Sequence, residues 1–131
     1  MQTAIIRSSR PRTWRRWFAF LGGGIAWTMH LLSIYVAGEF GCVSGWGRIS
    51  YLGISAVAWT IIIASIFLLI VSAAATVTGY LDARADAKRS SPSPEDEGGE
   101  YLSRLGWLFS TLFTLIIFVE TLPVFAYLHG C

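Results

Sequence analysis

The predicted fold of this chain depends above all on one stretch, GGGIAWTMHLLSIYVAGEFGC, residues 22–42. Together with the aromatic residues before it, it forms an apolar segment over about 17–38, which contains only Thr28, His30 and Ser33 as polar residues. About 20 such residues cross the ~30 Å hydrocarbon core of a bilayer as an α-helix. We therefore predict a transmembrane helix here, and the remaining apolar segments become its packing partners.

The composition extends this prediction to the whole chain. Of the 131 residues, 54% are hydrophobic and only 14% are charged, whereas soluble domains carry roughly 25% charged residues. Two further apolar segments, at about 51–80 and 102–128, are each long enough to span a bilayer. The predicted fold class is an all-α membrane protein, with a basic arm at 1–16 and one three-helix transmembrane domain at 17–131.

Three stretches between and before these spans are predicted to lie outside the membrane. Pro11 is expected to interrupt any helix in the arm, and the glycine-rich stretch 39–50 is expected to form a short loop. The segment 82–100, DARADAKRSSPSPEDEGGE, mixes Ser, Pro, Gly and charges of both signs. It is predicted to be an exposed linker, of which 82–89 could continue the second helix by a turn or two.

The basic residues predict the orientation. Nine of the ten fall in the arm or between positions 84 and 104, and Arg48 is the exception. Cytoplasmic flanks of membrane helices carry the excess of Lys and Arg. We therefore expect a multi-pass protein of a bacterial inner membrane, with its N-terminus in the cytoplasm and its C-terminus in the periplasm. A nucleic-acid partner is not expected, since no folded basic face accompanies the arm.

A cleaved targeting signal is the alternative for the first span. Arg15 and Arg16 loosely resemble a twin-arginine signal, and 36–38 could serve as a cleavage site. Removal would leave a two-span protein that begins near Glu39. Because the segment is longer and more aromatic than a usual signal, we expect residues 1–38 to be retained.

The only two cysteines, Cys42 and Cys131, are predicted to lie in the same oxidising compartment. A disulfide between them would close a loop of roughly ninety residues, which the chain-entropy model values at about 4–5 kcal/mol. Alternatively, the two thiolates could bind Cu(I), a soft metal ion, with help from His129. No CxxC or repeated Met-rich motif supports that alternative, so no cofactor is expected, although copper remains possible.

His30 and Glu120 form the candidate polar pair inside the membrane. Each lies about eight residues from the outer end of its span, so both are about 12 Å below the outer surface at 1.5 Å per residue. An ionisable side chain at that depth is costly against lipid and should face protein or water. We expect a contact that holds the two helices together, and the alternative is a metal, haem or proton site. Haem usually needs two axial ligands, and His30 has no second intramembrane histidine.

Small residues at the start of the first span predict close helix packing. Gly22 and Ala26 are spaced four apart, with Gly23 between them, as in small-xxx-small packing faces. These glycines lie inside an apolar span and no GK[ST] follows, so they do not form a phosphate loop. Glu39 is expected to be an interfacial carboxylate. Because no catalytic constellation of residues is present, the chain is not expected to be an enzyme.

The pattern G-x-x-x-W-x-x-H-L-x-x-x-Y from Gly23 to Tyr35, followed by Cys42, resembles a set of small bacterial three-span proteins of unknown function. Leu122-Pro123 approaching a C-terminal cysteine, Cys131, is the second point of similarity. Such proteins are typically encoded with haem–copper cytochrome c oxidase subunits and their assembly factors. Glu120 and the charged linker are not part of the pattern.

The resemblance implies a non-catalytic accessory protein, either a small subunit or an assembly helper of a respiratory oxidase, with membrane lipid and other membrane subunits as partners. Trp27, His30 and Tyr35 would then face the third helix or a partner. Two other functions stay open. One is a copper- or thiol-redox-handling membrane protein that uses Cys42, Cys131 and His129, and the other is a small self-associating transporter with His30 and Glu120 along its path.

Overall fold

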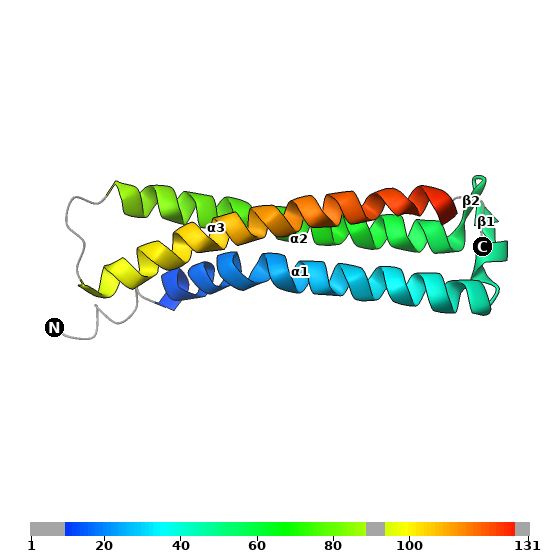
Figure 1. The fold of residues 1–131 in the computed structure, drawn as a ribbon, viewed down its shortest axis with the longest axis horizontal. Coiled ribbons are helices and arrows are strands. Elements are labelled where there is room, and N and C mark those ends of the chain that lie inside the picture. Colours follow the sequence, from blue (N-terminus) through cyan, green and yellow to red (C-terminus); the bar gives the residue numbers. More distant parts are fainter. Residues whose placement is uncertain (1–9, 89–93, 128–131) are drawn as a thin grey trace.

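Three long helices lie side by side in the computed structural model, which describes residues 10–88 and 94–127 (Figure 1). They are α1 (Arg10–Val43), α2 (Ala56–Ala87) and α3 (Pro94–Thr121). Each helix packs against both others, and all three are long and apolar enough to cross a membrane. The predicted all-α fold with three helices able to cross a membrane is confirmed.

The first helix is longer than the predicted span at both ends. α1 contains 34 residues, about 51 Å at 1.5 Å per residue, which exceeds the ~30 Å core of a bilayer. Pro11 does not interrupt it, contrary to expectation, because Pro11 lies in the first turn, where no intrahelical donor is required. The helix also continues through 39–43, which we expected to begin a loop.

A small cap connects α1 to α2 at one end of the bundle (Figure 1). It consists of a 3₁₀ helix, η1 (Trp46–Arg48), and a hairpin of β1 (Ser50–Tyr51) and β2 (Ile54–Ser55). The cap replaces the irregular loop that the sequence predicted, and it takes up the first residues of the predicted second span.

The hairpin turns on Leu52 and Gly53, whose φ angles are 54° and 79°. Positive φ at both central residues is the requirement of a type I′ turn, the two-residue turn that matches the twist of paired strands. Ser55 then accepts a hydrogen bond from the backbone N–H of Ala58 at 3.1 Å and caps α2. The turn and the cap fix the start of α2 at Ala56.

The third helix changes form at its end. The α-helix stops at Thr121 and η2 (Leu122–Tyr127) continues as a 3₁₀ helix. Pro123 has no backbone N–H, so it cannot donate to the carbonyl four residues earlier, and an α-helix is disfavoured there. The predicted third span, about 102–128, therefore contains two helical forms.

The segment predicted to be an exposed linker is mostly helical. α2 runs on to Ala87 and α3 begins at Pro94, while 89–93 lie outside the described residues. Asp82 and Asp86 are buried, so the expectation that 82–100 has nothing to bury is wrong for both. Their burial has an electrostatic cause, described below.

The predicted packing residues Gly22, Gly23 and Ala26 are all buried. A Cβ placed on Gly23 would lie 2.7 Å from the Ser110 Cα of α3, closer than carbon atoms approach one another. The backbones of α1 and α3 meet at this point, and the Ser110 hydroxyl donates to the Ala19 carbonyl of α1 at 2.6 Å. Small residues thus permit a direct hydrogen bond between the two helices.

Candidate functional site

His30 is the centre of a polar cluster to which all three helices contribute. Its side chain is 0% exposed. Ser65 of α2 and Thr121 of α3 face one ring nitrogen, and Glu120 of α3 faces the other. Because hydroxyl, imidazole and carboxylate groups are expensive to bury without partners, their convergence between apolar helices is the most distinctive chemical feature of the described chain.

The Nε2 atom of His30 faces two hydroxyls. Ser65 Oγ lies 2.9 Å away and Thr121 Oγ1 lies 3.4 Å away. The Thr121 hydroxyl donates its proton to the Ile117 carbonyl at 2.7 Å, so toward His30 its oxygen is free only to accept. The Ser65 hydroxyl can donate or accept by rotation.

The Nδ1 atom faces Glu120. It lies 3.5 Å from Oε2, within ion-pair distance, yet neither atom makes a geometrically acceptable hydrogen bond. The other carboxylate oxygen, Oε1, accepts from the indole N–H of Trp27 at 3.3 Å. The Trp27 ring stacks on Phe113 with centroids 5.4 Å apart, which fixes the indole against α3.

The structure thus brings together His30 and Glu120, the two residues that matching depth selected. Trp27 lies on the same face of α1 and contacts Glu120 of α3. This agrees with the expectation that Trp27 faces the third helix. Ser65 and Thr121 were not singled out from the sequence. Ser65 is a polar residue within an apolar run, and Thr121 directly follows Glu120; these are weak signals, since serine and threonine are common in membrane helices and bond to their own backbone.

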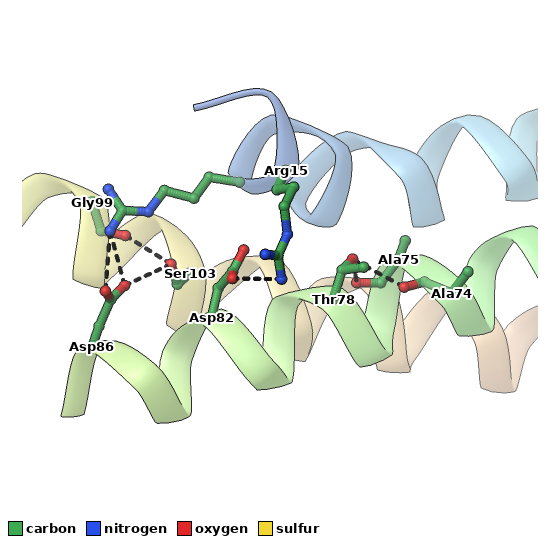
Figure 2. A network of polar contacts seen from close by, with 9 residues as sticks. Arg15, Ala74, Ala75, Thr78, Asp82, Asp86, Gly99 and Ser103 are labelled. Atoms are coloured by element: carbon green, nitrogen blue, oxygen red, sulfur yellow. Dashed lines mark hydrogen bonds and ion pairs between the residues drawn. The ribbon is translucent and has the colours of Figure 1, made fainter. Parts of the chain in front are cut away.

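A second polar cluster joins the three helices at the end opposite the hairpin, and Figure 2 shows its ion pairs. Arg16 of α1 donates from Nη2 to both carboxylate oxygens of Asp86, at 3.2 and 3.0 Å. The Ser103 hydroxyl of α3 lies 3.2 Å from Asp86 Oδ2 and 2.9 Å from the Gly99 carbonyl. Arg15 pairs with Asp82 at 2.9 Å. These carboxylates are therefore buried because cations are positioned beside them.

This second cluster was missed in the sequence, although a signal was present. Asp82 and Asp86 are four residues apart and so share one face of a helix. Arg15 and Arg16 lie at the start of a helix that must run antiparallel to it. Opposite charges at the same end of adjacent antiparallel helices are expected to meet, provided that the helix continues through 82–86 rather than ending at about 80.

Two of the remaining predicted residues, Cys42 and Glu39, lie at the hairpin end of α1. Cys42 is half-buried in the last turn of α1, and Glu39 is exposed one turn earlier. Cys131 and His129 lie outside the described residues, so the disulfide and the copper site stay predictions. Within residues 10–88 and 94–127, no group of three His, Cys, Asp or Glu side chains has the geometry to hold a metal ion.

Comparisons with known proteins identify no relative: no family model, no curated protein and no solved structure matches this chain. The resemblance to oxidase-associated three-span proteins stays a prediction from the sequence. Of its motif residues, Gly23 lies against Ser110, and Trp27 and His30 belong to the polar cluster.

Proposed function

We propose that this protein is a non-catalytic accessory membrane protein, a small subunit or assembly helper of a respiratory haem–copper oxidase. The observation that carries the accessory role is how little of each span is covered within the chain. In the most apolar 18-residue window of each span, only 28%, 22% and 17% is buried inside the structure. Most of each window is therefore at least partly open to lipid or to the helices of a partner.

The polar contacts inside the bundle support the same role. Ser72 of α2 hydrogen-bonds Thr114 of α3 at 2.7 Å, and Ser110 of α3 bonds the Ala19 carbonyl of α1 at 2.6 Å. Such contacts between helices contribute to their association in lipid. A bundle stabilised by its own polar contacts can present an apolar surface to a larger complex.

Tyr35 is the motif residue best placed to meet a partner. It is exposed on α1, whereas His30 is buried one turn and a half before it. Tyrosine is an amphipathic aromatic residue and is enriched at protein interfaces. The oxidase as the partner is suggested by the motif resemblance, and the exposed face of α1 near Tyr35 is where we expect the contact.

We further propose that the end of the bundle with Arg15 and Arg16 faces the cytoplasm of a bacterial cell. The start of α1, the end of α2 and the start of α3 lie at that end, away from the hairpin (Figure 1). The excess of basic residues there supports this orientation by the positive-inside rule.

The decisive experiment is co-purification. The tagged full chain, extracted in a mild detergent from membranes that contain a haem–copper oxidase, should bring down oxidase subunits identified by mass spectrometry and the absorption of their haem. A three-span protein of unrelated sequence with the same tag is the control. Tyr35→Ala should reduce the yield of oxidase at unchanged expression of the tagged chain. Recovery of this chain alone, or only as a homo-oligomer, would contradict the accessory role.

A further inference from the structure

His30 Nδ1 and Glu120 Oε2 are both buried polar atoms that face one another at 3.5 Å with no other hydrogen-bond partner in the described chain. A carboxylate oxygen and a bare ring nitrogen would oppose lone pair to lone pair. A proton on at least one of the two atoms removes this conflict, because a hydrogen then takes the place of one of the two opposed lone pairs. The geometry thus favours at least one proton on this pair of atoms.

The groups around the other ring nitrogen of His30, Nε2, are compatible with either protonation state of that atom. When Nε2 has no hydrogen, the Ser65 hydroxyl at 2.9 Å can donate to it. When Nε2 carries a hydrogen, Ser65 can rotate and accept, and Thr121 at 3.4 Å can accept as well. Since the Thr121 proton is held by the Ile117 carbonyl, Thr121 favours the protonated nitrogen. Rotation of one hydroxyl is enough to accommodate the change.

The described helices offer no fixed charge to balance the pair. From Ala56 to Leu81, α2 carries no charged residue, and Glu120 is the only one on α3 after Arg104. On α1 the nearest charged group toward the hairpin is Glu39, which is exposed, and Arg48 follows in η1. A neutral ring with a carboxylate has a net charge of −1, and one added proton gives a net charge of zero. In a low-dielectric environment, that proton is the compensation available.

We propose that His30 and Glu120 form a single reversible proton-binding site within the membrane. Glu120, whose side chain is 30% exposed although its Oε2 atom is buried, is the member that exchanges the proton with water. The O–H bond then breaks as the Nδ1–H bond forms, leaving an imidazolium beside a carboxylate, and no electrons are transferred to or from the protein. His30, which is 0% exposed, is the buried member. The site does not depend on the accessory role proposed above.

The test uses the full chain in lipid vesicles, with the Glu120 carboxyl band followed by infrared spectroscopy and the His30 ring nitrogens by ¹⁵N NMR. Glu120→Gln and His30→Gln assign the two signals, and His129 is the only other histidine. Both signals should titrate in common steps. Removal of His30 should move the Glu120 midpoint by about one pH unit or more, the threshold for coupled groups.

Reciprocity provides a second measurement if His30→Gln fails to fold. Coupling is symmetric between two binding sites, so Glu120→Gln must move the His30 midpoint by the same amount. Thr121→Val should also move the shared midpoint and leave the coupling in place, whereas the matched carboxylate control Glu39→Gln should move neither signal. Independent titration of the two groups, or no titration of either in the accessible pH range, would overturn the proposal.

Discussion

Arg16 and Asp86, seventy positions apart in the sequence, are joined by two hydrogen bonds of 3.2 and 3.0 Å from one guanidinium nitrogen. Their side chains are only 14% and 6% exposed. The pair ties the start of α1 to the end of α2, and Ser103 adds α3. This contact closes the bundle at the end opposite the hairpin.

Removing one member of this pair should destabilise the fold. Asp86→Asn leaves the Arg16 guanidinium buried without a counter-charge, and breaking a buried pair in this way costs about 3–5 kcal/mol. The measurement is unfolding of the full chain in detergent, followed by circular dichroism. Arg104→Gln is the matched control, because it removes the exposed Arg104–Glu100 pair, for which about 0.3–0.5 kcal/mol is expected. If both variants lowered the free energy of unfolding equally, the buried pair would contribute no more to stability than the exposed one.

Adjacent glycines in α1 should respond differently to alanine. A Cβ on Gly23 would lie 2.7 Å from the Ser110 backbone, whereas a Cβ on Gly24 would meet the Phe113 ring at 3.5 Å, an ordinary contact. Gly23→Ala should therefore force α1 and α3 apart and destabilise the protein by about 1–3 kcal/mol. Gly24→Ala should be neutral or stabilising, because alanine favours helix by up to ~1 kcal/mol. The same unfolding assay compares the stabilities of the two variants. If Gly24→Ala were the less stable variant, the helices would not meet at Gly23.

The hairpin turn should tolerate asparagine better than leucine. Leu52 is 93% exposed and has a φ angle of 54°, a region that costs a side chain such as leucine about 1–2 kcal/mol. Leu52→Asn creates the Asn-Gly pair that type I′ turns favour. Stability in detergent should rise by about 0.5–1 kcal/mol. If Leu52→Asn lost stability in lipid vesicles but not in detergent, contact between the Leu52 side chain and the bilayer would be stabilising instead.

The predicted disulfide between Cys42 and Cys131 is tested by mass spectrometry of the alkylated protein. Protein purified without reductant and alkylated under denaturing conditions should carry no label on Cys42 or Cys131, and reduction should expose both thiols. Because the bond would close a loop of roughly ninety residues, reduction should lower the free energy of unfolding by about 4–5 kcal/mol. Cys42→Ser should reproduce this loss and be insensitive to reductant. Two freely alkylated thiols in the unreduced protein would refute the bond and reopen the copper hypothesis.

The orientation is tested by labelling. In a background with both native cysteines replaced by serine, Ser50→Cys in the hairpin and Ala87→Cys at the end of α2 are both exposed positions. A membrane-impermeant maleimide should label Ser50→Cys in intact bacterial cells and Ala87→Cys only after the cells are opened. The opposite pattern would invert the proposed topology.

The number of spans and the depth of their polar residues can be predicted from the amino-acid sequence alone. Both depend on local properties, since a run of about 20 apolar residues must be helical to satisfy its backbone in lipid. Counting residues from the outer end of each span, at 1.5 Å per residue, then placed His30 and Glu120 at similar depth in the membrane. The small residues Gly22, Gly23 and Ala26 indicated where a neighbouring helix could approach.

Which faces of the helices meet depends on the assembled bundle. The rotation of each helix about its axis depends on packing against two neighbours at once, and this placed Ser65 and Thr121 on His30 and Ser110 against Gly23. It also turned Asp82 and Asp86 from exposed linker residues into buried partners of Arg15 and Arg16. A charged helix end is predicted to be exposed unless a distant part of the chain supplies the opposite charge, and that condition is met only when the bundle is assembled.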